Sequence, residues 1–332
     1  MNIIQIVRLL ILVVILLMSL SPKADIFEKQ TVGTSPWGKD DELGRLNLIS
    51  PESRAVVMAQ ANFSKAYDLS VDYFVGMPSW QAAGDPQYQF WMTHTPKGSV
   101  VDNVLGMGHD VNSHVSYTGS AISMYTHSGT HIDALNHFGI NGEIYNHFSA
   151  DEYLGDKGWK KNGAETIPPI VARGVLLDIP KAKQLDVLPD NYRITAADLK
   201  LALKFSNLEL QEGDVVMIRT GRMRDFETAK QYMANSPGLG MEAAAFLANA
   251  GAMIVGADNL SFEAFPSEVE GNYVPVHTYL LAQKGIPIIE LANLETLSRD
   301  ATYEFAFVGG SLKLRGADAA PIRPIAFPFK KG

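Results

Sequence analysis

Four side chains with metal-binding chemistry lie close together in the middle of this 332-residue chain. His127, His131, Asp133 and His137 fall within eleven residues, in a sequence with eight His and no Cys. Imidazole and carboxylate groups are the ligands that Zn²⁺ or Mn²⁺ accepts where thiolates are absent. Scattered surface or core histidines would not give so dense a pattern, and we therefore predict a metal centre.

The spacing of these residues excludes a regular helix or strand. On a helix, His127 and His131 share a face, but Asp133 lies on roughly the opposite side. On a strand, His127 and Asp133 would be about 20 Å apart, whereas metal ligands lie about 2.0–2.2 Å from their ion. We expect a strand over Ile122 to Thr126 that runs into a tight turn, with Gly129 at positive φ.

The same segment carries a family resemblance. Residues 127–133 read HSGTHID and are followed by His137, which resembles the HxGTHxDxxxH signature of the metal-dependent cyclase superfamily. That superfamily contains bacterial kynurenine formamidase and isatin hydrolase. The resemblance implies that His127, His131 and Asp133 are metal ligands and that His137 is the catalytic acid/base.

Further segments extend the resemblance over nearly the whole chain after residue 24. Residues 91–95 are similar to isatin hydrolase-like members in particular, and other similar segments cover residues 35–47, 276–290 and 321–324. The resemblance implies a swivelling β/β/α cyclase-type fold, a single α/β domain with a central sheet or barrel flanked by helices. It also leads us to expect a homodimer or homotetramer.

A second candidate ligand pair comes late in the chain. A short helical pattern from His277 to Lys284 ends at Gly285, a fitting residue after a helix. Ile286 to Leu291 then reads as an apolar strand, in which an ionised Glu290 is costly unless paired or bound to metal. On the residues alone, an edge strand with Glu290 facing water is slightly favoured. The resemblance implies instead that His277 and Glu290 complete a second metal site that shares Asp133, and leaves open whether one or two ions bind.

The N-terminus predicts export. Arg8 precedes an apolar run over residues 9–18, which has the length of a signal-peptide core and is shorter than a membrane span. We predict a signal peptide over residues 1–24, with an uncleaved anchor as the alternative, and a hydrolase domain over residues 25–332. The product would be periplasmic or secreted and would contain no disulfide.

The charge balance limits the partners. The net charge of −8 becomes −10 once Arg8 and Lys23 are removed with residues 1–24. An acidic surface argues against nucleic acid or an anionic membrane. Four buried strands and two helices are also expected in an α/β order: Val171–Ile179, Asp214–Thr220, Met253–Ala257, Ala306–Val308, Ala196–Phe205 with Thr195 as N-cap, and Met241–Ala250.

Two residues are candidates for the substrate pocket. Aromatic residues gather before the metal segment, and most of them are expected to be packing: Tyr73, Phe74, Trp80, Tyr88, Phe90 and Trp91. Trp80, in a loop-like stretch, is the best candidate for a wall that stacks on a flat substrate. Asp258 follows a predicted strand and either lines the pocket or caps a turn.

These features favour a metal-dependent amidohydrolase that acts on a non-peptide C–N bond. A bound Mn²⁺ or Zn²⁺ activates water, and His137 can move a proton to the leaving nitrogen. We expect a small cyclic or formyl aromatic amide as substrate, with an isatin-like lactam favoured and N-formylkynurenine as the alternative. A secreted metal- or ligand-binding protein without turnover is the alternative of another class, but it would not need His137.

Overall fold

The computed structural model describes residues 30–81 and 83–330. The predicted signal peptide, residues 1–24, lies outside the described residues. Within the described ranges, every helix is too short or too polar to cross a membrane.

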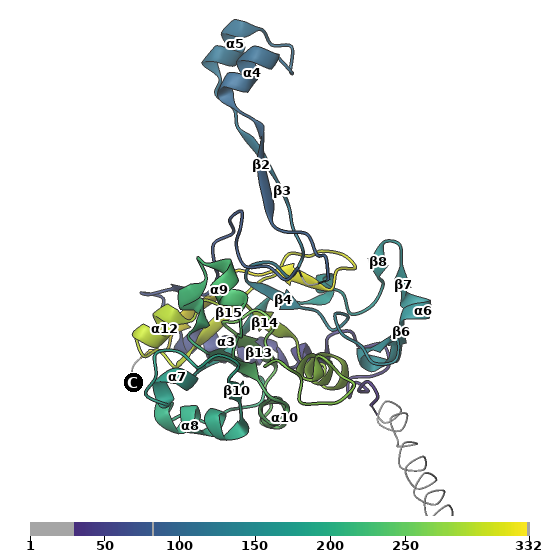
Figure 1. The fold of residues 1–332 in the computed structure, drawn as a ribbon, viewed down its shortest axis with the longest axis vertical. Helices are drawn as coiled ribbons and strands as arrows, with labels where there is room; N and C mark the ends of the chain where they lie inside the picture. Colours follow the sequence, from purple (N-terminus) through teal and green to yellow (C-terminus); the bar gives the residue numbers. More distant parts are fainter. Residues whose placement is uncertain (1–29, 82, 331–332) are drawn as a thin grey trace, which may run out of the picture.

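A nine-stranded sheet forms the centre of the molecule (Figure 1). Strands β9, β11, β13 and β14 are parallel neighbours, and antiparallel strands flank them on both sides. In spatial order the strands are β1 (Tyr67–Asp68), β17 (Ile325–Pro328), β15 (Glu304–Gly309), β9 (Ile170–Asp178), β11 (Val215–Arg219), β13 (Ile254–Ala257), β14 (Ile288–Glu290), β4 (His131–Asp133) and β16 (Ala319–Pro321).

The parallel strands are apolar on both faces because both faces are covered. Along β11, Val216 and Ile218 belong to one buried apolar cluster, while Val215 and Met217 belong to a second cluster on the other face. The four strands predicted from apolar runs are all present, with ends shifted by one or two residues. This confirms the predicted α/β fold with a central sheet flanked by helices.

The two predicted helices pack against the first of these clusters. Helix α8 (Ala196–Ser206) begins at Thr195, which forms a capping box with Asp198, and α10 is Met241–Asn249. The remaining elements of the body are α3 (Pro51–Gln60), α6 (Ala150–Tyr153), α7 (Ile179–Ala182), α9 (Ala229–Met233), α11 (Pro275–His277), α12 (Glu295–Arg299), η1 (Gly44–Leu48), η2 (Tyr145–His147), η3 (Ala164–Thr166), η4 (Arg222–Asp225), η5 (Thr278–Gln283) and the strand pairs β5 (Glu143–Ile144) with β6 (Phe148–Ser149), β7 (Leu154–Gly155) with β8 (Gly158–Trp159), and β10 (Arg193–Ile194) with β12 (Gly238–Leu239).

Residues 89–123 leave the body as a long projection, which we call the arm (Figure 1). Strands β2 (Gln89–His94) and β3 (Gly119–Ser123) form its two-stranded ribbon, and helices α4 (Pro96–Asp102) and α5 (His109–His114) form its tip. The strand predicted over Ile122 to Thr126 is therefore wrong at its C-terminal end. Strand β3 stops at Ser123 because the chain must turn there from the ribbon into the body.

Candidate metal centre

The central sheet positions three of the predicted ligands. His131 and Asp133 are two residues apart on β4, so their side chains point to the same face. Glu290 on the neighbouring β14 is paired with His131 in the register of the two strands. Strand β14 lies inside the sheet, between β13 and β4, and Glu290 is only 4% exposed. The edge-strand reading of Glu290 is therefore wrong.

A tight turn before β4 brings in His127, as its spacing requires. Gly129 has a φ of +61°, and a Cβ at this position would lie 2.3 Å from the Tyr73 ring. Both the backbone conformation and the space therefore demand glycine. The Nδ1 atom of His131 lies 2.8 Å from the carbonyl oxygen of Gly129. If Nδ1 donates this hydrogen bond, Nε2 keeps its lone pair for a metal ion.

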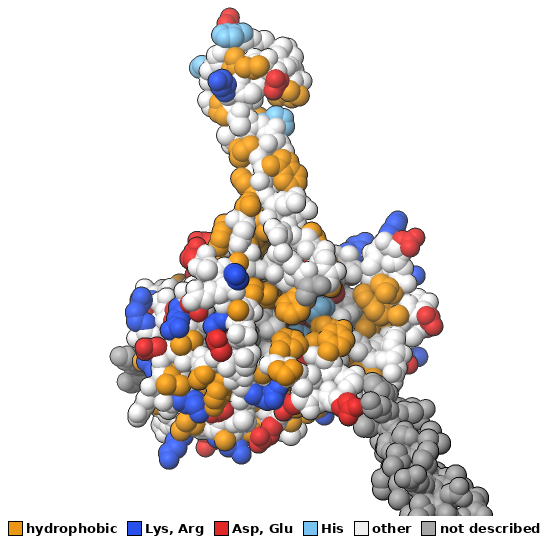
Figure 2. All heavy atoms as spheres, viewed as in Figure 1, with side chains coloured by type: hydrophobic (Ala, Val, Ile, Leu, Met, Phe, Trp, Pro, Cys, Tyr) orange, Lys and Arg blue, Asp and Glu red, His pale blue; other side chains and the backbone are white. Residues whose placement is uncertain are grey.

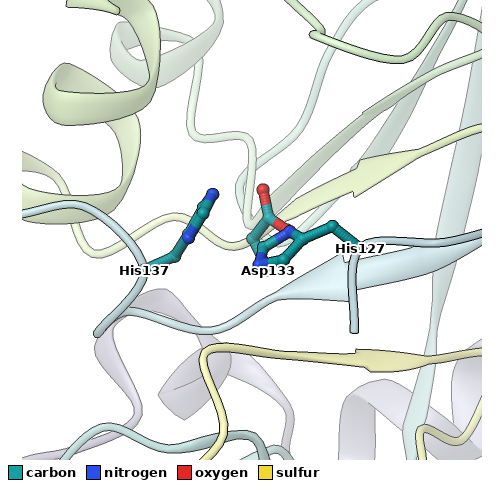
Figure 3. Close-up of side chains that lie close together, drawn as sticks. All are labelled: His127, Asp133 and His137. Carbon is teal, nitrogen blue, oxygen red and sulfur yellow. The ribbon is translucent and has the colours of Figure 1, made fainter. Parts of the chain in front are cut away.

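The first group of possible ligands contains His127, Asp133 and His137, whose ligand atoms lie within 4.8 Å of one another. In Figure 3 the side chains of His127 and Asp133 overlap and His137 lies to one side of them, with its ring centroid 3.9 Å from that of His127. The Nδ1 atom of His127 is 2.9 Å from Oδ1 of Asp133. The structure thus places His137 close enough to a bound ion to act on its ligands or to be one.

A second group contains Asp133, His277 and Glu290, again within 4.8 Å. The Nε2 atom of His277 is 3.3 Å from Oε1 of Glu290 and 3.9 Å from Oδ2 of Asp133. The Nε2 atom of His131 lies 3.4 Å from Asp133 and 3.5 Å from Glu290. Asp133 therefore belongs to both groups and His131 borders both, an arrangement that could hold one ion or two.

Buried atoms without partners show that this donor set fits a cation. Nε2 of His127, Nε2 of His131 and both carboxylate oxygens of Asp133 have no hydrogen-bond partner among the described residues. Leaving such groups buried and unpaired is costly, and bound metal would supply the missing partner. Nitrogen and oxygen donors without thiolate suit Zn²⁺ or Mn²⁺.

The electrostatics of the site point the same way. Burial tends to lower the pKa of His127, but the charges of Asp133 and Asp318 outweigh it and raise that pKa to about 10. Burial also tends to lower the pKa of His277, but Glu263 and Glu290 outweigh it and raise that pKa to about 10. The carboxylates therefore demand positive charge, which protons supply in a metal-free protein and which a metal ion would supply on displacing them.

His137 lies in a different environment from the other histidines. Burial and the positive charge of His127 lower its pKa, which favours the neutral imidazole. Its ring centroid is 3.9 Å from that of His127, and its Nδ1 is 3.6 Å from Oδ2 of Asp318. A neutral imidazole beside a carboxylate, at the margin of a metal site, is suited to moving protons.

Sequence reasoning missed two acidic residues that hold the ligands in place. Asp318 precedes β16, accepts a hydrogen bond from the Thr126 hydroxyl (3.0 Å) and lies 3.4 Å from Nε2 of His127. Oε1 of Glu263 lies 2.6 Å from Nδ1 of His277 and accepts a hydrogen bond from the backbone N–H of His277. Neither residue belongs to a sequence motif. The pairing of β16 with β4 brings Asp318 to the site, and the packing of α11 brings His277 to Glu263.

A cavity of about 160 Å³ opens beside the ligands. Trp80 forms part of its wall and stacks on Phe265, with ring centroids 6.2 Å apart and an angle of 26° between the planes. The expected position of Trp80 beside the site agrees with this geometry, and its contact with substrate stays a prediction. The lining residues are Trp80, Tyr125, His127, His137, Phe138, Leu260, Ser261, Phe265, Tyr273, Val274, His277 and Glu290.

Asp258 does not line this cavity. Its side chain is fully buried and accepts hydrogen bonds from the backbone N–H and hydroxyl of Thr220 and from the N–H of Gly221. Burial raises its pKa to about 6. The pocket-lining role considered for Asp258 is therefore wrong, and the alternative role, fixing a turn after a strand, is the one that its contacts support.

Comparisons with known proteins agree with this architecture. The family model described as "Putative cyclase" matches residues 67–264, and a search of curated proteins found no significant match. A crystal structure described as a novel cyclase is 27% identical, with a TM-score of 0.79 over 90% of this chain and 100% of that chain.

Two isatin hydrolase structures show the same fold at lower identity. Isatin hydrolase A from Ralstonia solanacearum is 19% identical, with a TM-score of 0.60 over 79% of this chain and 91% of that chain. An isatin hydrolase bound to the product analogue thioisatinate is 18% identical, with a TM-score of 0.59 over 85% of this chain and 100% of that chain. The family match spans more than half of the sequence and includes the whole His127–His137 segment, and the chain therefore belongs to the cyclase family.

Proposed function

We propose that this protein is a metal-dependent hydrolase of small aromatic amides, and that an isatin-like lactam is the preferred substrate class. The observation that carries the proposal is that a candidate metal site and an aromatic cavity lie side by side. Buried, unpartnered ligand atoms lie at one end of a cavity whose wall is aromatic and whose lining includes His137.

The metal would be held by His127, His131 and Asp133, with His277 and Glu290 available to complete the coordination or to bind a second ion. A bound Mn²⁺ or Zn²⁺ would supply a water of lowered pKa and would polarise a carbonyl group. Glu263 and Asp318 would keep the imidazoles of His277 and His127 in the orientation that the ion needs, as outer-shell carboxylates commonly do.

The cavity selects for a small flat molecule. Its volume of about 160 Å³ is close to that of a cavity of about 150 Å³ known to hold benzene, which excludes a peptide or polymer as a fully enclosed substrate. Trp80 and Phe265 present nearly parallel rings, and an aromatic substrate stacked there gains about 0.5–1.5 kcal/mol beyond simple burial. These features favour an aromatic lactam or formamide over an aliphatic amide.

His137 would perform the proton transfer. Its neutral imidazole can take a proton from the attacking water and return it to the leaving nitrogen, so that the amide C–N bond breaks without an unstable amide anion. Asp318, 3.6 Å from Nδ1 of His137, would orient the ring and stabilise its protonated form. A protein that only binds a metal or a ligand would have no use for this pair.

The test is a hydrolysis screen with purified protein that has been stripped by a chelator and reloaded with Mn²⁺ or Zn²⁺. Isatin, N-formylkynurenine and acetamide are compared at equal concentrations, and products are followed by absorbance or chromatography. We expect isatin to be opened fastest, N-formylkynurenine more slowly and acetamide hardly at all. Metal-loaded protein that binds isatin but turns over none of the three would favour the binding-protein alternative.

A further inference from the structure

A second cavity lies directly beside the cavity at the metal centre. Figure 2 shows apolar side chains around a hollow that contains histidine, on the face from which the arm rises. The cavity at the ligands, which we call the inner cavity, has a volume of about 160 Å³, and the neighbouring outer cavity has about 490 Å³. Because four side chains contact both spaces, the wall between them is one side chain thick: Trp80, Leu260, Ser261 and Phe265.

The outer cavity has polar but uncharged walls. The described residues that line it include no Asp, Glu, Lys, Arg or His, whereas three His and one Glu line the inner cavity. The inner cavity therefore has groups for metal and acid–base chemistry, and the outer cavity has groups for recognition alone. Five residues line only the outer cavity: Asn191, Met233, Asn235, Ser236 and Pro266.

Charged groups close to the outer cavity are already paired. The guanidinium of Arg193 donates a hydrogen bond to the carbonyl oxygen of Pro266 and lies 3.8 Å from Glu268. Asp190, on the loop before β10, lies 3.3 Å from the guanidinium of Arg222. A charged ligand group in the outer cavity would have to compete for these partners, and leaving a charge without one is costly. A neutral polar group fits better.

Asn191 and Asn235 are held together as a pair. The backbone N–H of Asn191 donates a hydrogen bond to the carbonyl oxygen of Asn235 (2.8 Å), and the two residues have left-handed φ angles of +55° and +51°. Asparagine adopts this conformation more readily than most residues. Both residues come shortly before the paired strands β10 and β12, so that two side-chain amides extend from a fixed framework.

The same framework is tied to the wall between the cavities. Asn259 is fully buried, and its Nδ2 atom donates a hydrogen bond to the carbonyl oxygen of Pro237 (2.8 Å). Pro237 belongs to the loop of Asn235, and the residue after Asn259 is Leu260, which lines both cavities. The fold therefore sets the spacing between the inner cavity and the two amides, as a binding site on a rigid support requires.

The volumes show why a substrate would use both spaces. The inner cavity is close in size to a cavity of about 150 Å³ that holds benzene, so an aromatic ring with its reacting amide fills it. A substituent on that ring must leave the inner cavity. The outer cavity is the neighbouring space, and only side chains such as Trp80 and Phe265 stand between the two.

We propose that the outer cavity is a second substrate subsite, which binds a neutral substituent that both donates and accepts hydrogen bonds, such as a carboxamide. The aromatic lactam would occupy the inner cavity, and a short chain on its ring would pass Trp80 and place the carboxamide beside Asn191 and Asn235. Side-chain amides also donate and accept, so the two groups are complementary. This inference rests on the proposed function and sharpens its substrate class.

The test compares three isatins that differ only at the end of a two-carbon chain. The chain is attached to the ring carbon para to the nitrogen and ends in a carboxamide, in an isopropyl group of similar shape, or in a carboxylate. Initial rates with metal-reloaded protein give kcat/KM. We expect kcat/KM for the carboxamide compound to exceed that of the isopropyl compound roughly 10-fold, the worth of one or two net hydrogen bonds. The carboxylate compound should also fall below the carboxamide compound.

Replacing either asparagine should reduce this preference. Asn191→Gly and Asn235→Gly delete the amides but keep the left-handed backbone, which glycine adopts freely. Asn207→Gly is the matched control, because Asn207 is also an exposed asparagine with a φ of +55°, at the end of α8. Each cavity variant should lower the ratio of the carboxamide to the isopropyl kcat/KM several-fold. The control should leave that ratio unchanged.

Binding of oxindoles with the same three chains gives a readout that needs no turnover. An oxindole lacks the ketone that activates isatin for ring opening, so its Kd can be measured by calorimetry. We expect the same order of affinity among the chains and the same loss in the two cavity variants. If this order holds while no isatin is hydrolysed, then the proposed function fails and the subsite stands.

Any of three results would refute the subsite. The first is isatin hydrolysis in which the carboxamide and isopropyl compounds have equal kcat/KM and their oxindoles have equal Kd. The second is a carboxamide preference that survives in both Asn191→Gly and Asn235→Gly. The third is a preference for the carboxylate, which would make the outer cavity a site for anions.

Discussion

The metal centre and the arm are built in opposite ways. The centre gathers side chains from the turn before β4, from β4 itself, from β14 and from α11, across more than 160 residues of sequence. Its ligands are buried and are held by outer carboxylates. The arm is one continuous segment, residues 89–123, and its large side chains face solvent.

This contrast separates a region with a buried core from a region without one. The geometry of the centre is fixed by the core of the sheet, so one folded copy has every proposed ligand in place. The arm has no core of its own among the described residues, and its apolar ribbon gains stability only when something packs against it. The candidate ligands and the exposed apolar surface thus belong to different regions, which meet near the cavity-lining residues Tyr125 and Trp80.

The largest effect that we expect comes from removing the metal. His131→Ala takes away a proposed ligand in the middle of the centre, and chelation takes away the ion; either change should reduce hydrolysis to background. Loss of a ligand that binds only the folded state should also lower the melting temperature. Metal content, rate and melting temperature are measured together.

The arm provides the control for this prediction. Leu105→Asp should leave the metal content unchanged, because Leu105 lies far from the ligands in sequence and on the tip of the arm. Full hydrolysis by protein that is verified to be metal-free would remove the basis of the proposed function.

Replacing His137 should separate metal binding from catalysis. His137→Ala should keep most of the metal and lose about 10²–10⁴-fold in rate, the usual contribution of a general acid–base group. Metal content is measured by atomic absorption and kcat by steady-state kinetics. If metal and rate fall together, then His137 is a ligand, as its distance from His127 and Asp133 also permits.

The two regions differ in how far sequence could predict them. The candidate ligands of β4 and of the turn before it can be predicted from the sequence, because metal binding severely restricts the type and spacing of residues such as His127, His131 and Asp133. The strands of the core were found because parallel strands covered on both faces are continuously apolar. These signals are local, and each lies within one short segment.

Other features needed the tertiary structure. Asp318 lies close to His127 only because β16 pairs with β4. The carboxylate of Asp258 accepts hydrogen bonds from Thr220 and Gly221 and does not line the cavity. Phe90 and Trp91 read as members of an aromatic cluster, but they lie on the exposed ribbon. The residue types in a short aromatic segment do not tell whether the side chains face the core or lie exposed on a projecting ribbon.

A pair of glycines tests the contrast at the level of the backbone. Gly129 in the metal turn and Gly106 in the arm have similar φ angles, +61° and +68°. A Cβ on Gly129 would overlap Tyr73, whereas a Cβ on Gly106 meets nothing within 4 Å. Gly106→Ala should cost only the left-handed strain, about 1–2 kcal/mol, and that strain can be confined to the arm.

Gly129→Ala should add an overpacking penalty of about 1–3 kcal/mol and should weaken metal binding, because the turn places His127. Denaturant unfolding and metal titration of both variants measure the difference. Equal losses of stability in the two variants, with metal affinity unchanged, would mean that the turn is not tightly constrained by Tyr73.

The smallest effect separates two tryptophans, one from each region. Trp80 lines the cavity and stacks on Phe265, while Trp91 lies on the ribbon of the arm and is 46% exposed. Trp80→Ala should raise KM for an aromatic lactam several-fold, because stacking is worth about 0.5–1.5 kcal/mol beyond burial, and should leave metal content unchanged. Trp91→Ala should leave KM nearly unchanged, because Trp91 does not line the cavity. Steady-state kinetics on both variants measure the two values of KM. An aliphatic amide serves as the reference substrate, since it has no planar ring to stack on Trp80.

If Trp80→Ala raises KM equally for aromatic and aliphatic substrates and lowers the melting temperature, then Trp80 contributes only to packing. If instead Trp91→Ala raises KM as much as Trp80→Ala does, then the division between a body that holds the site and an arm that is separate from it does not hold.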